Sequence, residues 1–366
     1  MKFLSLNPEA FGMDFSDLRL RIVKFEKRGK FFDLVSWNEK TIPEGIIKDG
    51  EILDREKLVL IIKNIVDKAR GRRITVKYVV ASLPEQKAFL QVIKVPKMDK
   101  DELKTAIPFE IENYIPVPID QVYLDYELIS PEFNNAKNLD VLIGAMPKNI
   151  VDSYSYCIKE AGLIPKALEV ESQSIARVLI KNHISFSPVL IIDFGKSTTS
   201  FIVFSGCSLR FTSSIDISSQ DLTQAISQKL GITLDEAENL KLKYGLEISD
   251  KSARNKKVVE AITPLIIDLI KQTRKYIDYY HTHSNNMPIS EGGGEIEKVL
   301  LCGLGTNLKG LSKFISRELG IKAEIANPWI NIFPELNKKI PKISFKESLG
   351  YTTAMGLALC GIQEEI

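Results

Sequence analysis

The chain has 366 residues, of which 44% are apolar, and its 49 basic and 47 acidic side chains give a net charge of +2. This length predicts two domains or one large two-lobed body with an ample core. The balanced charge excludes a strongly basic nucleic-acid-binding protein and a direct electrostatic attachment to a membrane.

The four cysteines (Cys157, Cys207, Cys302 and Cys360) are widely separated and form no Cys-x-x-Cys pair. They are typical of small buried hydrophobes in a reducing compartment. Acidic residues near the N-terminus exclude the apolar core of a signal peptide. The longest apolar runs, 58–62 and 354–360, are too short to span a membrane.

Hydrophobic periodicity predicts alternating strands and helices along the chain. Strands are expected within 11–37 and at 76–83, 89–95, 122–129 and 139–145. Helices are expected at 53–69, 99–114, 148–162, 171–182, 220–230, 234–244 and 258–281. Asp99 and Glu102 form a capping box for the helix at 99–114, and Pro108 should kink that helix or confine it to its later part.

The most informative segment is 189–204, in which two apolar strands flank a polar turn. Gly195 lets the backbone approach a ligand closely, and the hydroxyls and N–H groups of the turn suit a phosphate chain. Asp193, at the end of the first strand, is placed to hold Mg²⁺ through water. A hairpin with a merely polar turn explains the same residues, so this segment alone leaves both interpretations open.

A second glycine turn follows the strand expected at 298–302, and a helix is expected after it to about Leu319. Such a Gly-x-Gly turn is a weak signal by itself, because many such turns only pack tightly. Within one α/β pattern, however, phosphates on the hairpin and adenosine on this turn would define a nucleotide site in a cleft.

At this point the order of segments resembles the actin/Hsp70/sugar-kinase superfamily, and within it the PilM family of type IV pilus assembly proteins, which is related to FtsA. The resemblance covers nearly the whole chain. It is most specific at 42–52, 95–103, 109–118, 124–126, 221–226, 234–241 and 277–279. The stretches 95–103, 109–118 and 124–126 match a small extra subdomain that PilM and FtsA share and actin lacks.

The resemblance implies an α/β, actin-like (ribonuclease H-like) fold with two lobes around an ATP–Mg²⁺ cleft and the extra small subdomain. The implied division is: lobe I core 1–75, extra subdomain 76–147, lobe I helices 148–185, lobe II core 186–217, upper subdomain of lobe II 218–290, lobe II core 291–344, and a C-terminal return to lobe I at 345–366.

The resemblance also implies a set of site residues. The second phosphate loop would comprise Asp193, Gly195, Lys196, Ser197, Thr198 and Thr199, and the adenosine loop Gly303, Gly305 and Thr306. Lys241 matches a position that can reach the ribose. Glu171 is the candidate for polarising water, with a carboxylate on a helix surface as the alternative. Asp14, Ser16 and Arg21 fall in the first phosphate loop, and Mg²⁺ would be held by Asp193 through water, with Asp14 beside it.

Three of the four loops depart from the superfamily pattern. In the first loop Ser16 replaces a glycine, Leu18 removes a hydroxyl, and Asp17 carries a negative charge where phosphate would lie. Two like charges about 4 Å apart repel by roughly 4 kcal/mol at an effective dielectric near 20, so an inward-pointing Asp17 would weaken binding strongly. Ser218-Ser219 replaces an expected Gly-Gly, and the adenosine loop has lost one glycine. The Asp193 hairpin alone is intact.

The function implied is a cytoplasmic scaffold of the type IV pilus machine that is peripheral at the inner membrane through its partner. It would bind the N-terminal tail of a PilN-like bitopic inner-membrane protein in a groove between the lower lobe and the extra subdomain, near 76–83 and 89–95. ATP would tune the groove, and other inner-membrane and motor components of the pilus are further expected partners. No nucleic-acid binding or membrane insertion is expected.

Two alternatives remain open at this level. One is an active ATPase or small-molecule kinase, which needs intact phosphate loops and a positioned base. The other is a secretion-system or FtsA-like division relative, which is expected to carry a transmembrane or amphipathic helix that this sequence does not show.

Overall fold

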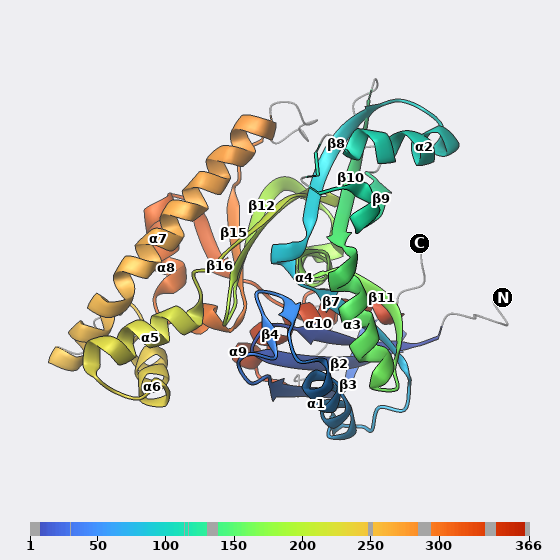
Figure 1. The fold of residues 1–366 in the computed structure, drawn as a ribbon. Coiled ribbons are helices and arrows are strands. Elements are labelled where there is room, and N and C mark those ends of the chain that lie inside the picture. The colour runs from blue at the N-terminus through green and yellow to red at the C-terminus, as the bar shows by residue number, and fades with distance from the viewer. Residues whose placement is uncertain are drawn as a thin grey trace.

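The computed structural model describes residues 8–362 except 30, 113, 116, 130–137, 248–251, 285–293 and 334–341. The chain forms two lobes, each built on a β-sheet, with helices between the sheets and on their outer faces (Figure 1). The first sheet has the strand order β11-β7-β1-β2-β3-β6, and the second has the order β16-β15-β12-β13-β14-β8-β10-β9.

The strands of the first sheet are β1 (Ala10–Phe15), β2 (Arg19–Arg28), β3 (Phe31–Thr41), β6 (Arg70–Gly71), β7 (Tyr78–Leu83) and β11 (Ile164–Val170). Those of the second are β8 (Phe89–Pro96), β9 (Val122–Leu128), β10 (Asn138–Pro147), β12 (Ser185–Phe194), β13 (Thr199–Gly206), β14 (Ser208–Ile215), β15 (Lys298–Cys302) and β16 (Lys322–Ile325). The short strands β4 (Ile47–Lys48) and β5 (Glu51–Ile52) pair with each other.

The α-helices are α1 (Arg55–Asp67), α2 (Lys100–Ile111), α3 (Lys148–Glu160), α4 (Glu171–Leu179), α5 (Ser219–Leu230), α6 (Leu234–Tyr244), α7 (Ala253–Ser284), α8 (Leu311–Leu319), α9 (Phe345–Ser348) and α10 (Thr352–Ile362). Short 3₁₀ turns are η1 (Glu85–Lys87), η2 (Ile119–Gln121), η4 (Lys181–His183), η5 (Leu304–Asn307) and η6 (Leu349–Tyr351). Most predicted helices are therefore present, whereas β11, β14, β16 and α10 have no counterpart among the predicted elements.

Each sheet separates two layers of core, as the alternation of side chains along a strand requires. In β2, Leu20 and Ile22 pack with α1 and α3, whereas Val23 packs on the opposite side, between the two sheets. In β12, Ile192 packs with the outer helices α5 to α8, and Ile191 belongs to the central core. The predicted hairpin is present, with Phe194 paired to Thr199 across the turn.

The extra subdomain consists of β8, β9 and β10 with α2 packed on one face (Figure 1). The predicted capping box is confirmed: the Asp99 carboxylate accepts the Glu102 N–H at 2.9 Å, and the Glu102 carboxylate accepts the Asp99 N–H at 3.1 Å. The helix begins at Lys100 and includes Pro108, so Pro108 does not confine it to its later part.

Two features of the subdomain differ from the predicted division. The strand predicted at 76–83 is β7, which pairs in parallel with both β1 and β11 and therefore belongs to the first lobe. The extra subdomain begins after Leu83. At its other side β8 pairs with β14 through Gln91 and Phe211, which makes the subdomain an extension of the second lobe's sheet. Buried Arg210 of β14 and Asp140 of β10, 3.4 Å apart, add an ion pair across this junction.

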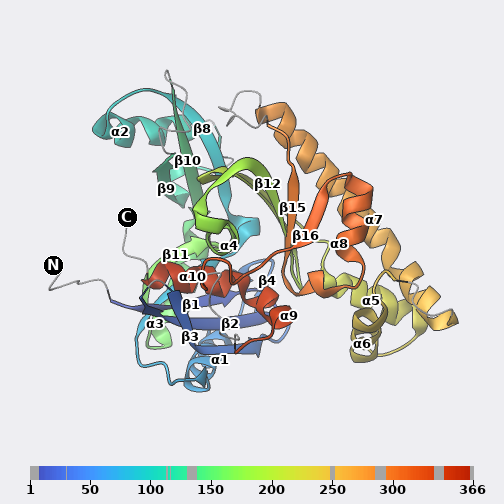
Figure 2. The ribbon, with the colours of Figure 1, turned by 180° about the vertical axis from the view of Figure 1, so that it is seen from behind.

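Helices α4 and α10 cross between the two sheets and join the lobes through one continuous core (Figure 2). A Cβ on Gly356 of α10 would lie only 2.0 Å from the Ser174 carbonyl oxygen of α4. A Cβ on Gly12 of β1 would lie 2.3 Å from the carbonyl oxygen of Ala354. The glycines therefore allow α10 to lie directly on α4 and on the first sheet. In the described part of the chain, no helix combines the length and apolar character needed to cross a membrane.

Replacing Gly356 with alanine tests this crossing. In an exposed helix the change would stabilise by about 1 kcal/mol, because alanine is the better helix former. Here we expect the free energy of unfolding in urea to fall by at least about 2 kcal/mol, since overpacking must separate α4 from α10. Gly144→Ala, whose Cβ would meet a Leu90 methyl at 3.4 Å and the Asp125 carbonyl oxygen at 3.9 Å, both ordinary contacts, is the matched control and should change little. An unchanged or higher stability of Gly356→Ala contradicts the packing.

Candidate functional site

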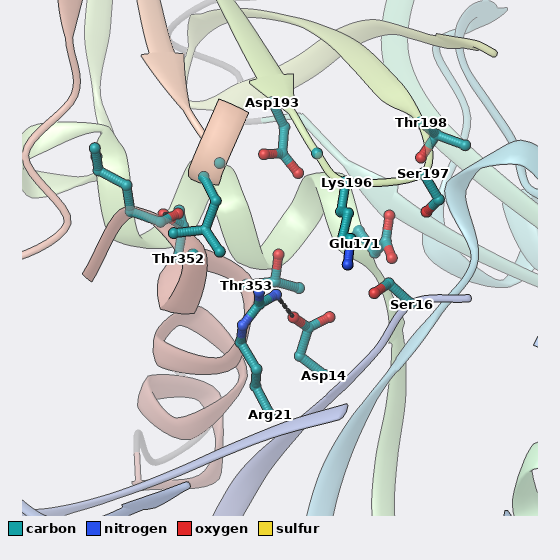
Figure 3. A pocket seen from close by; sticks show the side chains of 15 residues that line it. Asp14, Ser16, Arg21, Glu171, Asp193, Lys196, Ser197, Thr198, Thr352 and Thr353 are labelled. Atoms are coloured by element: carbon teal, nitrogen blue, oxygen red, sulfur yellow. Dashed lines mark hydrogen bonds and ion pairs between the residues drawn. The ribbon is translucent and has the colours of Figure 1, made fainter. Parts of the chain in front are cut away.

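The loops singled out in the sequence meet at one pocket between the lobes (Figure 3). The pocket is lined by the turn after β1, the β12–β13 turn, the start of α4, the turn after β15 and the start of α10. Its residues are Asp14, Ser16, Arg21, Glu171, Asp193, Gly195, Lys196, Ser197, Thr198, Gly303, Leu304, Leu349, Gly350, Thr352 and Thr353. The cavity has a volume of about 60 Å³, which is room for a few water molecules.

Four predicted residues lie outside this pocket. Thr199 is buried and donates its hydroxyl to the Ile217 carbonyl at 2.5 Å. Gly305 lies against the Phe194 ring, and buried Thr306 donates its hydroxyl to the Gly303 carbonyl at 2.7 Å. These three residues contact other parts of the loops and stabilise their conformation, and they do not line the pocket. Lys241 lines a neighbouring cavity.

The β12–β13 turn is held by its own backbone. The Gly195 N–H donates to the Thr198 carbonyl at 3.0 Å. The carbonyls of Gly195 and Lys196 accept the N–H groups of Ser219 and Gln220, at 3.0 and 3.1 Å. The turn is thereby fixed to the first turn of α5, and the side chains of Lys196 and Ser197 remain directed at the pocket (Figure 3).

Gly303 is required by the approach of the β15 turn to Asp193. Parallel strands β12 and β15 place Asp193 beside Cys302. Gly303 has φ +82°, and a Cβ there would lie 2.3 Å from the Asp193 carboxylate. Any side chain at this position would collide with the carboxylate or displace it, so the glycine serves close contact between the two predicted loops.

Asp17 does not point into the pocket. Its carboxylate accepts the N–H groups of Asp49 and Gly50, at 2.8 and 3.1 Å, in the β4–β5 turn. These two residues have φ values of +50° and +76°, so their N–H groups converge on one anion. The expectation that Asp17 would place its charge where phosphate lies is therefore not supported by the structure, because a distant turn binds that charge.

Arg21 is the main cation of the first loop. Its side chain is buried, with one guanidinium nitrogen 3.8 Å from Asp14 and another 2.7 Å from Glu39. Glu39 of β3 also pairs with Arg19. The guanidinium lies 5.9 Å from the centre of the Tyr351 ring. Glu39 thus holds Arg19 and Arg21 in place through ion pairs. The sequence did not indicate this role, because Glu39 lies on a different strand from the two arginines.

Three carboxylates, those of Asp14, Glu171 and Asp193, line the pocket with two cations, Arg21 and Lys196. Burial raises the pKa of Asp14 to about 6 although Arg21 lowers it, and Asp193 contributes to the rise. Burial likewise raises the pKa of Asp193 to about 6, against the lowering effects of Arg21 and of the hydrogen bond from Cys302. Burial lowers the pKa of Lys196, and nearby Arg19 adds to this effect. The site therefore favours a cation between its carboxylates.

Glu171 begins α4 and lines the pocket beside these groups. Burial raises its pKa well above the usual value for glutamate, and Asp14, Glu85 and Asp193 raise it further. A raised pKa makes a carboxylate a stronger base, and Glu171 lies beside Asp14 and Asp193 at the pocket. Its role in polarising water stays a prediction.

Asp14 and Asp193 are the predicted Mg²⁺ residues. In the portion of the chain that the structure describes, no three His, Cys, Asp or Glu side chains gather closely enough to bind a metal directly. Two carboxylates on opposite sides of a pocket can instead hold a hydrated Mg²⁺ through its water molecules, as this ion prefers. The donor set fits that mode of binding.

A larger cavity of about 400 Å³ adjoins the pocket, and Lys196 and Leu304 line both. Its wall is formed by α5, α6 and the turn after β15. Buried Lys241 donates to the carbonyl and hydroxyl of Ser219, at 2.8 and 2.7 Å, and lies 2.8 Å from Glu238. Ser219, one of the serines that replace the expected glycines, therefore anchors this lysine. A contact between Lys241 and a ribose stays a prediction.

Two groups at the pocket were missed from the sequence. Thr352 and Thr353 line the pocket where η6 continues into α10, and the N-terminus of α4 at Glu171 favours an anion there. A Thr-Thr pair directly before an apolar run is the signal that was available. Buried Glu85 accepts the Ser172 N–H at 3.0 Å and so caps α4, which only the fold reveals.

Two lobes built on two sheets, joined by crossing helices, with paired turns from both lobes around one pocket, define an actin-like protein. A family model described as type IV pilus assembly protein PilM matches residues 12–362. The chain belongs to this family.

Comparisons with individual known proteins agree with membership of this family. The chain is similar to a solved structure described as a PilM–PilN type IV pilus biogenesis complex, at 25% identity and a TM-score of 0.78, covering 98% of this chain and 100% of the other. MreB5 of Spiroplasma citri bound to AMPPNP shares the fold at 12% identity and a TM-score of 0.58, over 97% and 96% of the two chains. A segment of 109 residues, 30% of this chain, is 27% identical to cell division protein FtsA of Enterococcus hirae and spans a quarter of that relative's length.

Asp193→Asn tests the electrostatics of the pocket. A carboxyl whose folded pKa of about 6 exceeds its unfolded value of 3.8 contributes stability below pH 3.8 and loses it as the pH rises through 6. At pH 8 the neutral amide should therefore raise the free energy of unfolding by about 1–3 kcal/mol. The gain should shrink towards pH 4.5. Urea unfolding at pH 8, 6 and 4.5 measures it.

The matched control is Asp216→Asn, at an exposed carboxylate, which should leave stability unchanged at each pH. If Asp193→Asn is less stable than the wild type at pH 8, the carboxylate is stabilised by its surroundings and the description of the pocket is wrong.

Proposed function

We propose that this protein is an actin-like scaffold of type IV pilus assembly, that it binds the cytoplasmic N-terminal tail of a PilN-like inner-membrane protein, and that ATP with Mg²⁺ tunes this binding. The observation that carries the proposal is a cavity of about 340 Å³ where the extra subdomain meets the first lobe. The described similarity to a PilM–PilN complex over the full chain supports it.

The cavity lies between η2 and β9 of the subdomain and the first turn of α3. Its lining residues are Val117, Gln121, Val122, Pro147, Lys148 and Asn149. Lys148 donates to the Asp120 carbonyl at 2.8 Å, and the Tyr123 hydroxyl donates to Asp152 of α3 at 3.1 Å. These contacts fix the subdomain's edge to α3 and shape a site for a short extended segment, with apolar walls and a few polar groups.

The two walls of this cavity are attached to different lobes. Helix α3 packs with α1 in the outer core of the first lobe. The subdomain is joined to the second lobe by the β8–β14 pairing and the Arg210–Asp140 ion pair. A change in the angle between the lobes therefore alters the cavity, which is how a nucleotide between the lobes would tune the binding of a tail.

The residues at the interlobe pocket fit ATP with Mg²⁺. Arg21 and Lys196 supply positive charge, and the N-terminus of α4 at Glu171 favours phosphate oxygens. The adjoining cavity of about 400 Å³ lies within the usual size range for small-molecule sites and suits a nucleoside. Bound Mg²⁺ would supply charge between Asp14 and Asp193. The narrow phosphate end implies that binding requires the facing turns to separate.

Calorimetric titration with ATP and Mg²⁺ tests this site. We expect a dissociation constant below millimolar. Lys196→Met should weaken it by tenfold or more, because a charge-assisted hydrogen bond to phosphate contributes about 1.5–3 kcal/mol. Lys229→Met, at an exposed lysine of α5, is the matched control.

If the wild type binds ATP with Mg²⁺ more weakly than millimolar, the proposed tuning by nucleotide is contradicted, and the protein would act as a scaffold without a nucleotide switch. Phosphate release that disappears in Asp193→Ala would instead indicate an active ATPase.

A fluorescent peptide tests the partner site directly. The probe is a synthetic peptide with the sequence of the cytoplasmic N-terminal tail of a PilN-like single-span protein, and fluorescence anisotropy gives its affinity for the full chain. Asn149→Trp should fill the cavity and weaken binding by tenfold or more. Glu160→Trp, at the exposed far end of the same helix, should bind normally. Failure of the wild type to bind, or normal binding by Asn149→Trp, contradicts the proposed site.

A further inference from the structure

Among the described residues, strand β9 pairs only with β10 and ends the second sheet, so that no described strand pairs with its other edge, called the free edge below. The Ile129 N–H donates to the Asp140 carbonyl, which sets the odd-numbered residues of this strand towards β10. Because backbone groups alternate sides along a strand, the N–H and C=O groups of Leu124, Tyr126 and Leu128 lie along the free edge.

Two carboxylates stand beside this edge. Asp125 and Glu127 are exposed and two residues apart, so they project from the same face of β9. Tyr123 projects from that face as well, and its hydroxyl bonds to Asp152 of α3. The acidic face therefore turns towards α3, the helix that supplies Lys148 and Asn149 to the cavity proposed above. On the opposite face Leu124 and Tyr126 pack against the core under α2.

Asp125 also covers the middle of the edge. Its carboxylate accepts the N–H of Tyr126 at 2.9 Å, which is a donor that an added strand would need. A charged side chain that blocks an edge donor prevents pairing with neutral strands. A lysine or arginine on an incoming strand would attract the carboxylate and release the Tyr126 N–H for a backbone hydrogen bond.

We propose that the β9 edge docks an extended segment with basic side chains at alternating positions, and that Asp125 is the gate that selects it. The occupant is the juxtamembrane cytoplasmic tail of the inner-membrane partner, so the inference rests on the proposed function and names the chemistry of its ligand. Cytoplasmic segments beside membrane spans carry an excess of Lys and Arg, which complements Asp125 and Glu127. Backbone pairing gives affinity, and the two carboxylates give selectivity.

Paired peptides and two Asp125 variants separate the two roles of this residue. The probes are the tail peptide described above and the same peptide with each Lys and Arg replaced by Gln. The wild type should prefer the basic peptide. Asp125→Asn keeps an oxygen for the Tyr126 N–H but loses the charge, so it should weaken the basic peptide about three- to fivefold without improving the neutral one.

Asp125→Ala removes both the charge and the hydrogen bond that occupies the Tyr126 N–H. It should weaken the basic peptide and bind the neutral peptide more tightly than the wild type does. Glu110→Gln, at an exposed carboxylate of α2, is the matched control and should change neither affinity. Equal affinities of the two peptides for the wild type, or an unchanged preference in Asp125→Ala, contradict the proposal that Asp125 selects basic segments.

N-methylation of alternate peptide bonds tests the backbone pairing without changing the protein. In an added strand, methyl groups on one set of alternating residues face β9 and should abolish binding, whereas those on the other set should be tolerated. If both sets are tolerated while the unmodified tail still binds, the edge proposal fails and the partner proposal stands. If the unmodified tail does not bind, the partner proposal fails as well.

Discussion

The crossing of α4 and α10 is the constraint on which the rest of the structure depends. Gly356 allows the two helices to touch at the Ser174 carbonyl, and Gly12 allows α10 to lie on the first sheet. Both helices reach the interlobe pocket, through Glu171 of one and Thr352 of the other. The same contact that joins the lobes therefore places the N-terminus of α4, which favours an anion, beside Thr352 and Thr353.

The charges around that pocket support the proposal that a nucleotide binds there together with a metal ion. Asp14 and Asp193 have raised pKa values, and Arg21 is shared between Asp14 and Glu39. A phosphate chain adds negative charge to this set, and a hydrated cation between the carboxylates offsets it. Because the Asp17 carboxylate is bound to the β4–β5 turn, the altered first loop repels phosphate less than its composition indicates.

Local patterns predicted the fold well where the signal lies within a few residues. The β12–β13 turn, the capping box at Asp99 and the amphipathic helices follow from neighbouring residues alone. Helix α10 was missed because its residues are apolar on all sides and show no helical period. The direction of Asp17, the bracing of Arg21 by Glu39 and the position of β7 in the first lobe depend on partners distant in the chain, which no local pattern reveals.

We propose that the interlobe pocket is coupled to the cavity lined by Val122, Lys148 and Asn149, because the two walls of that cavity are attached to different lobes. Reciprocal titration of the full chain tests this directly: the affinity for the tail peptide is measured with and without saturating ATP and Mg²⁺, and the affinity for ATP with and without the peptide. Linkage requires the two ratios to be equal, and a coupling of about 1–3 kcal/mol predicts a change of at least about fivefold in each. Identical affinities in the presence and absence of the other ligand would contradict the account.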